Sequence, residues 1–231
     1  MNASTKALAA EFLGTFALVF IGAGAGTVLG GGQIPGIAFA HGLTLMVFAF
    51  AFGDISGCHI NPAVTVGLAA AGKFPSRNVV PYIIVQIIGA VAAGFSLLAI
   101  FGGPVNHLGA TLVDTQRITY GAAFALEAVG TFFLVNTVLN TAVRGAAVQL
   151  APFAIGMTLT VCILMFGALT GGSINPARTI GPAVATGDFD GIGVYLVAQF
   201  LGGIIAGVVY RVLWAPQPAS APLGTGHVPA E

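Results

Sequence analysis

Long stretches without any charged residue are the feature that most constrains this sequence. Asp, Glu, Lys and Arg are absent from residues 12–53, 78–113, 145–177 and 191–210. Each stretch can hold at least one segment of the roughly 20 apolar residues that cross a bilayer core of about 30 Å. Only 6% of all residues are charged, whereas a soluble domain carries about 25%. The chain is therefore predicted to be an integral, multi-pass membrane protein.

Composition also argues against several classes of function. The formal net charge is zero, which gives no reason to expect a nucleic acid partner. Cys58 and Cys162 lie in apolar surroundings without a metal-ligand spacing, so we predict neither a disulfide nor a metal site, and no cofactor. Lys6 precedes an apolar run, as in a signal peptide, but Glu11 lies inside that run and no suitable cleavage site follows closely. Residues 7–30 are therefore predicted to form a retained span.

The chain contains two copies of one unit. Residues 11–16 match residues 127–132 at an offset of 116. Three further matches follow in the same order at offsets of 113 to 114: residues 42–45 with 156–159, 60–63 with 174–177, and 86–89 with 199–202. Matches in one order at nearly one offset indicate an internal repeat. We predict a first unit at 1–110, a connecting loop at 111–118, a second unit at 119–214 and a disordered tail at 215–231.

Each unit is predicted to hold three membrane spans and one short apolar segment. The spans are residues 8–29, 37–52 and 79–101 in the first unit, and 120–139, 152–167 and 192–214 in the second. The short segments, 61–70 and 175–185, would cover only about 15 Å as helices, which indicates re-entrant half-helices. Since three spans is an odd number, the second unit enters the membrane from the opposite side. The predicted fold is an all-α membrane protein with six transmembrane helices and two re-entrant half-helices in an inverted repeat.

Positive charges outside the predicted spans indicate the orientation. In the six-span arrangement Arg117 falls on one side of the membrane, and five basic residues fall on the other: Lys6, Lys73, Arg77, Arg144 and Arg211. Since Lys and Arg concentrate in cytoplasmic loops, we predict that both termini lie in the cytoplasm.

Both short segments begin with Asn-Pro-Ala, namely Asn61, Pro62 and Ala63 in the first unit and Asn175, Pro176 and Ala177 in the second. Asparagine is favoured at the N-cap of a helix and proline at its first position. If both half-helices start at mid-membrane, their positive dipole ends meet there, and the two asparagine amides can donate to one passing acceptor. A water held in this way turns its hydrogens outward, which interrupts a proton wire, and the paired positive ends repel cations.

The loops before the two asparagines are predicted to line this pore. Irregular backbone cannot lie exposed in lipid, so these loops must be buried or line a cavity. The predicted pore-lining carbonyls are those of Gly57, Cys58, His59, Ile60, Gly171, Ser173 and Ile174. Glu11 and Glu127 hold matching positions in the two units, and we predict that each carboxylate braces a loop by accepting its backbone N–H groups. A proton relay through these acids is the alternative.

The paired Asn-Pro-Ala segments, Arg178 directly after the second one, and the acids Glu11 and Glu127 resemble the aquaporin family over about residues 7–215. The resemblance implies a homotetramer in a lipid bilayer, with one water-conducting pore per protomer. Residues 181–190 most resemble the tonoplast intrinsic proteins of plants. A bacterial chain of this kind would lie in the inner membrane.

The resemblance also implies a selectivity filter of four residues near the outer mouth: His41, Ile163, Gly172 and Arg178. Strict water channels of the family carry Phe and His at the first two positions. Glycerol channels usually carry Asp at the position of Thr179. The set found here is similar to that of tonoplast-type channels that pass ammonia as well as water, because Gly172 leaves room and His41 adds a polar group. In such relatives a loop histidine approaches the filter, and His107 lies in the loop between the two units.

The predicted function is thus a passive channel for water, ammonia and other small neutral solutes that excludes protons and ions. A strict water channel and a glycerol facilitator are the alternatives within the family. A secondary transporter could also be built from inverted repeats with broken helices, but no intramembrane acid sits beside the Asn-Pro-Ala segments. The motifs HExxH and GxSxG and a paired catalytic acid motif are absent from the sequence, so no enzymatic activity is predicted.

Overall fold

The computed structural model describes residues 3–215, and this part of the chain consists of helices and their connecting loops. The α-helices are α1 (Thr5–Leu29), α2 (Ile34–Ser56), α3 (Pro62–Ala70), α4 (Ser76–Phe101), α5 (Tyr120–Val138), α6 (Ala151–Thr170), α7 (Pro176–Thr186) and α8 (Ile192–Val209). Shorter helical segments are η1 (Val105–Gly109), η2 (Leu139–Val143), η3 (Val148–Leu150) and η4 (Tyr210–Trp214). The tail predicted at 215–231 lies outside the described residues, except for Ala215.

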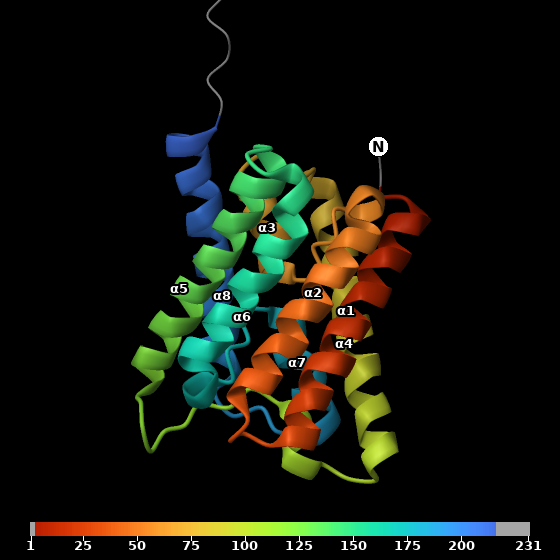
Figure 1. Ribbon diagram of the computed structural model, residues 1–231, viewed down its shortest axis with the longest axis vertical. Helices are drawn as coiled ribbons and strands as arrows, with labels where there is room; N and C mark the ends of the chain where they lie inside the picture. Colours follow the sequence, from red (N-terminus) through yellow and green to blue (C-terminus); the bar gives the residue numbers. More distant parts are fainter. Residues whose placement is uncertain (1–2, 216–231) are drawn as a thin grey trace, which may run out of the picture.

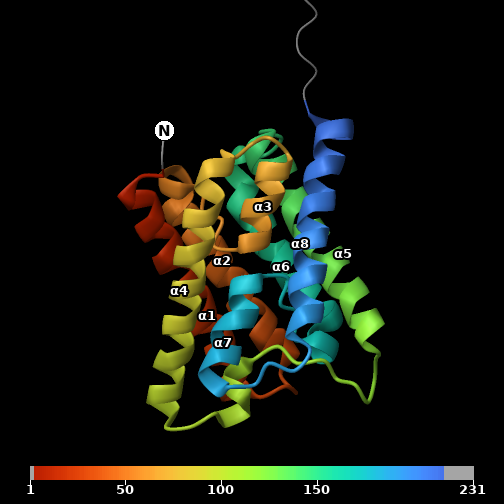
Figure 2. The ribbon, with the colours of Figure 1, turned by 180° about the vertical axis from the view of Figure 1, so that it is seen from behind.

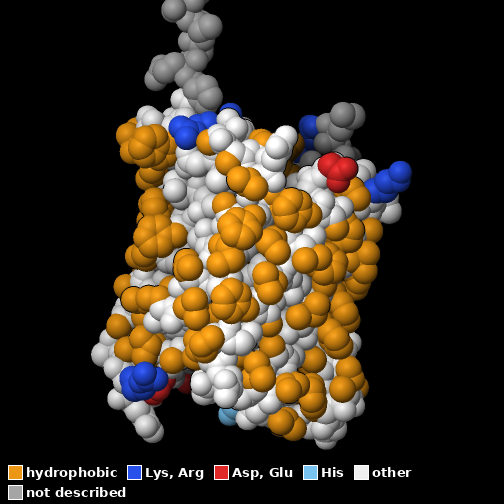
Figure 3. Space-filling view, viewed as in Figure 1, with side chains coloured by type: hydrophobic (Ala, Val, Ile, Leu, Met, Phe, Trp, Pro, Cys, Tyr) orange, Lys and Arg blue, Asp and Glu red, His pale blue; other side chains and the backbone are white. Residues whose placement is uncertain are grey.

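Six helical segments are long and apolar enough to cross a bilayer: Thr5–Leu29, Ile34–Ser56, Ser76–Phe101, Tyr120–Val143, Val148–Thr170 and Ile192–Trp214. They form one bundle (Figure 1). Apolar side chains cover the middle of the visible surface, while charged side chains gather at its two ends (Figure 3). The predicted all-α fold with six transmembrane helices is confirmed.

The two half-helices lie inside this bundle. α3 has 9 residues and α7 has 11, which corresponds to about 14 and 17 Å at about 1.5 Å per residue. Figure 2 shows α3 in one half of the bundle and α7 in the other, with both helices beginning near the middle. Each half-helix has proline in its first turn and an asparagine side chain capping its backbone. The predicted pair of re-entrant half-helices in an inverted repeat is therefore confirmed.

The two units meet where α2 crosses α6. A Cβ atom on Gly42 would lie 2.5 Å from the carbonyl oxygen of Gly156, and a Cβ on Gly156 would lie 2.4 Å from that of Gly42. These two residues belong to one of the sequence matches that define the repeat. Small residues let helices approach closely in lipid, where packing and hydrogen bonds replace the hydrophobic drive. This crossing holds the two halves, and hence the two half-helices, in register.

The ends of the bundle differ in charge. The start of α1 and the end of η4 lie at the same end of the molecule (Figure 1). The loop from α3 to α4, which contains Lys73, also lies at this end. We call it the inner end, after the predicted cytoplasmic side. At the opposite, outer end, Arg117 lies 3.6 Å from Asp114.

Candidate functional site

Asn61 and Asn175 join the two half-helices at the centre of the bundle. The Oδ1 atom of Asn61 accepts hydrogen bonds from the first N–H groups of α3, and Oδ1 of Asn175 does the same for α7. The Nδ2 atom of Asn61 donates to the carbonyl of Ile174 at 2.9 Å, and Nδ2 of Asn175 donates to the carbonyl of Ile60 at 2.9 Å. Each amide carries two hydrogens, so one hydrogen on each asparagine remains for another acceptor.

Glu11 and Glu127 bind the two loops that precede Asn61 and Asn175. Both oxygens of Glu11 accept backbone N–H groups, from His59 at 2.8 Å and from Ile60 at 2.7 Å. Glu127 likewise accepts from Ser173 at 3.0 Å and from Ile174 at 2.7 Å. Both carboxylates are fully buried. The expectation that no intramembrane acid sits beside the Asn-Pro-Ala segments is therefore wrong, because each carboxylate binds the residue directly before an asparagine. Such charge-assisted bonds to backbone N–H groups are the strong kind of hydrogen bond, so each loop is anchored by its own half of the chain.

This anchoring sets the direction of the loop carbonyls. A trans peptide holds its N–H and its C=O on opposite sides. Since the N–H groups of His59 and Ile60 point at Glu11, the carbonyls of Cys58 and His59 point away from it. The backbone turns through left-handed conformations at Cys58 (φ 45°), Ile60 (φ 40°) and Ile174 (φ 42°), which are unfavourable for residues other than glycine. The hydrogen bonds to the two carboxylates compensate for this strain.

Three cavities follow one another through the bundle. A narrow central cavity of about 50 Å³ is lined by the loop residues 57–61 and 173–175, together with His41 and Arg178. An inner cavity of about 670 Å³ shares His59 and Ile155 with it. An outer cavity of about 160 Å³ shares Arg178 with the central one. The three cavities mark a path through the bundle that passes both asparagines.

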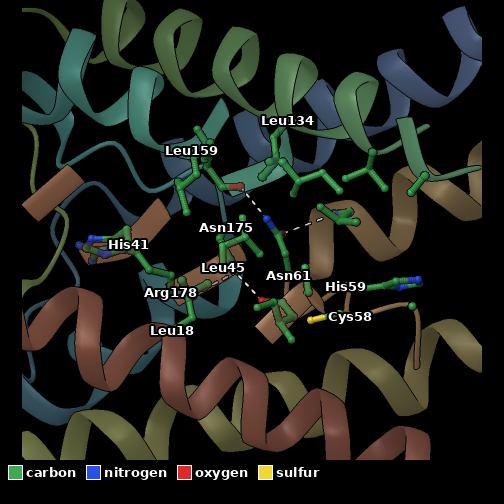
Figure 4. Close-up of a pocket in the computed structure, with 18 of the residues that line it drawn as sticks. Leu18, His41, Leu45, Cys58, His59, Asn61, Leu134, Leu159, Asn175 and Arg178 are labelled. Carbon is green, nitrogen blue, oxygen red and sulfur yellow. Dashed lines mark hydrogen bonds between the residues drawn. The ribbon is translucent and has the colours of Figure 1, made fainter. Parts of the chain in front are cut away.

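Polar and apolar side chains together line the central cavity. Figure 4 shows His41 and Arg178 at one end, Cys58 and His59 at the other, and Asn61 and Asn175 between them. The remaining wall includes four leucines in repeat-related pairs: Leu18 with Leu134, and Leu45 with Leu159. Because these leucines offer no polar atoms, a permeating molecule has few hydrogen-bond partners beyond the loops, the asparagines and the outer end.

Three of the four residues predicted to form the filter, His41, Ile163 and Arg178, line the central or the outer cavity, whereas Gly172 lines neither. His41 lines the central cavity, Ile163 lines the outer one, and Arg178 lines both. Only 1% of His41 and 3% of Arg178 is exposed, so the path is narrow at this level. Among the described residues, no partner is found for Nε2 of His41 or for Nε and Nη1 of Arg178. Buried polar atoms are normally hydrogen-bonded, so these atoms are placed to bind a molecule in the path.

The tautomer of His41 follows from one contact. Its Nδ1 atom lies 2.9 Å from the carbonyl oxygen of Ile37. A carbonyl only accepts, so Nδ1 carries the proton and, in the neutral ring, Nε2 is an acceptor. His41 therefore offers an acceptor at the same level at which Arg178 offers donors.

Gly172 was predicted to leave room for a solute, but it lies close against Ile163. Its backbone is left-handed, with φ +59°, and an added Cβ would lie 3.0 Å from Cγ1 and 3.1 Å from Cα of Ile163. Any side chain at this position would press on Ile163 and would strain the loop. Glycine is thus required by the backbone conformation and by the close approach of Ile163.

The backbone carbonyls predicted to line the pore fall into distinct groups. Gly57, Cys58, His59, Ile60, Ser173 and Ile174 line the central cavity, whereas Gly171 lines the outer one. The carbonyls of Ile60 and Ile174 accept the cross-bonds from the asparagines. They therefore contribute to joining the two units.

Sequence reasoning did not assign a role to two glutamines behind the half-helices. Gln86 donates from Nε2 to Glu11 at 2.8 Å and to Thr65 at 3.1 Å. Gln199 donates to Glu127 at 2.9 Å and to Thr179 at 3.3 Å. Both glutamines are fully buried. They belong to one of the four repeat matches, which was the signal that could have identified them.

His107 does not lie among the residues that line the central or outer cavity. Its Nδ1 atom lies 3.6 Å from Oδ2 of Asp188, and its side chain is 64% exposed. The neighbouring residue Asn106 does line the outer cavity, and its side chain donates to the carbonyl of Thr27 at 2.7 Å. In this structure the loop between the units contributes Asn106 to the outer cavity.

Comparison with known proteins gives a consistent result. Residues 1–210 match the model of the family described as major intrinsic protein. The chain is 38% identical to aquaporin Z of Rhodopseudomonas palustris, with 93% of this chain and 95% of that protein covered. It is 39% identical to aquaporin AqpM of Methanothermobacter thermautotrophicus, with 92% and 99% covered. The solved structure of the aquaglyceroporin from Plasmodium falciparum has a TM-score of 0.80 at 24% identity and covers 90% of this chain and 96% of its own, which bears on the fold alone.

Proposed function

Since the chain belongs to the major intrinsic protein family of membrane channels, the aquaporins, we propose that it conducts water together with ammonia and other small neutral solutes, and that it excludes protons and ions. Family membership supports a passive channel for water or small solutes. The choice of ammonia and the exclusion of ions are inferred from the filter and from the junction of the half-helices. The observation that carries the proposal is the pairing of an acceptor on His41 with donors on Arg178 at the narrow level of the path.

In the proposed pore, a water molecule binds between the two asparagines. Each amide has one hydrogen free after its cross-bond to the other unit. A water oxygen that accepts both hydrogens points its own hydrogens along the path in opposite directions. The chain of water molecules then reverses its hydrogen-bond direction at this point, so a proton cannot hop through it. Glu11 and Glu127 act here as loop braces, since their oxygens already accept bonds from the loops.

Ion exclusion rests on fixed positive charge. Arg178 carries a permanent guanidinium charge in the path. The start of each half-helix adds roughly half an elementary charge through the helix dipole. Cations meet repulsion at both places, and ions of either sign would lose their hydration in a path that is narrow and half apolar.

Ammonia fits the filter because of its hydrogen-bonding pattern. It has three N–H donors and one lone pair, so it can donate to Nε2 of His41 while it accepts from Arg178. Ile163 offers no polar atom at this level, so a solute must find its partners on the other side of the path. A filter of two donors would favour water, which has two lone pairs. Replacing one donor with the His41 acceptor shifts the balance towards a solute with more N–H groups.

The proposal is tested with purified protein in liposomes that contain a pH-sensitive dye. An ammonium gradient should alkalinise the interior faster than in empty liposomes, and water permeability should rise in the same preparation. His41→Phe should remove most of the ammonia flux and leave water flow within a few fold, because it removes the acceptor. Wild-type protein that passes water without ammonia would make the chain a strict water channel. Glycerol flux as large as ammonia flux would make it a glycerol facilitator.

A further inference from the structure

A glycine on α1 lies directly against the ring of His41. A Cβ atom on Gly22 would lie 2.4 Å from Cδ2, 2.6 Å from Nε2 and 2.7 Å from Cγ of His41. The three distances are nearly equal, so the added atom would lie over the face of the imidazole. Gly22 itself is buried and is absent from the lining of the central and outer cavities. The ring of His41 thus rests on the bare backbone of α1.

The ring has little freedom to escape in other directions. Its Nδ1 atom is held by the carbonyl of Ile37 at 2.9 Å, and the side chain is 1% exposed. An ordinary contact requires about 3.4 Å or more, so a methyl group on Gly22 would displace the ring by about 1 Å. The open space beside His41 is the central cavity. Displacement therefore moves the ring into this cavity and narrows the path.

Comparison of the two repeat units shows that the contact between Gly22 and His41 is not a general requirement of helix packing. The offset of 116 that relates Glu11 to Glu127 also relates Gly14 to Gly130, so this position is glycine in both units. Gly14 packs against Ile60, and Gly130 packs against Ile174. The same offset relates Gly22 to Val138, which is not glycine. His41 corresponds to Ile155 at the offset of 114.

Val138 and Ile155 line both the central and the inner cavity. The position of Gly22 therefore tolerates a full side chain in the unit whose partner is aliphatic. The repeat does not demand a glycine there, and the glycine occurs where the partner is histidine.

We infer that Gly22 is a specificity-determining residue of this channel. It touches no solute, and it acts as a positioning residue that lets the His41 ring stand back from the path. The width of the path beside His41, and hence the largest solute that passes, is set from α1. This inference rests on the proposed filter.

The test is a double-mutant cycle of Gly22→Ala and His41→Ala, read out as water and ammonia permeability of liposomes. Gly22→Ala should lose most of its ammonia flux, with a smaller loss of water flow, because the ring narrows the path. Alanine is a better helix former than glycine, so weaker helix formation cannot explain a loss. In the His41→Ala background the same change should have no effect, because no ring remains to be displaced.

Gly193→Ala is the matched control, since Gly193 lies in the first turn of α8 with nothing within 4 Å of its added Cβ. It should leave the ammonia-to-water ratio as in wild type. An unchanged ratio in Gly22→Ala would overturn the inference, and so would an equal loss with and without the His41 ring. A His41→Ala protein with the wild-type ratio would instead overturn the proposed filter. Size-exclusion profiles and thermal stability of each variant show whether the protein is folded.

Discussion

The carboxylate of Glu127 offers the sharpest test of how the loops are held. It accepts four hydrogen bonds, from Thr170 Oγ1, Ser173 N, Ile174 N and Gln199 Nε2, at 2.7 to 3.0 Å. Glu127→Gln keeps the size of the side chain but replaces one oxygen with an NH2 group. Whichever oxygen is lost, the new donor faces two other donors. The loop can no longer satisfy all its N–H groups.

The cost can be estimated from these contacts. A buried donor left without an acceptor costs about 1–3 kcal/mol, so two of them cost about 2–6 kcal/mol. In soluble domains of this size, about 1 kcal/mol corresponds to a shift of about 2–4 °C in Tm. We therefore expect Glu127→Gln to lower the Tm of the detergent-solubilised protein by roughly 5–20 °C. Water flow per folded protein should also fall, because Asn175 follows the released loop directly.

The assay is thermal unfolding followed by fluorescence-detected size exclusion. Asp54→Asn serves as the control, since it makes the same chemical change at an exposed residue at the end of α2. Glu11→Gln should reproduce the effect, because Glu11 accepts the matching bonds from Ser56, His59, Ile60 and Gln86. A Tm for Glu127→Gln equal to that of the Asp54→Asn control would refute the account of the loop brace.

Three further outcomes are expected. Arg178→Val should admit a proton or cation leak while water flow is retained, because it removes the fixed charge from the path; an unchanged leak in folded protein would place the barrier elsewhere. An epitope on the N-terminus should be accessible only after the membrane is permeabilised, since the loop with Lys73 lies at the same end as the N-terminus and basic residues concentrate in cytoplasmic loops; labelling of intact cells would reverse the orientation. Native mass spectrometry in mild detergent should give four copies of the chain, as in the homotetramer that the family resemblance implies, and a monomer alone would argue against it.

Most of the fold could be predicted, because the apolar runs indicate the membrane spans and the internal repeat indicates the two-unit arrangement. The half-helices could be placed to within a residue, since proline and asparagine mark where each begins. The end of α2 was predicted too early, at residue 52, because Asp54 interrupts the apolar run. The helix continues to Ser56, since Asp54 reaches water at the inner end, and it ends at Gly57 with φ 85°.

The filter could be predicted only in part. The resemblance to a family identified His41, Ile163, Gly172 and Arg178 as a set. His41, Ile163 and Arg178 line two adjoining cavities, while Gly172 packs against Ile163, and their role as a filter stays a prediction. The cross-bonds of the asparagines could not be predicted, because they depend on how two distant units are placed against each other. The contact between Gly22 and His41 could not be predicted either, since it depends on the distance between α1 and α2.

The temperature dependence of water flow in wild-type liposomes tests the central claim most directly. A continuous path of the kind traced past Arg178, Asn61, Asn175 and His59 predicts a low activation energy, close to that of water diffusion in bulk. It also predicts no saturation and no dependence on a proton or sodium gradient, together with a proton leak no greater than that of empty liposomes. An activation energy as high as that of the bare lipid bilayer, or flow that requires an ion gradient, would contradict the account.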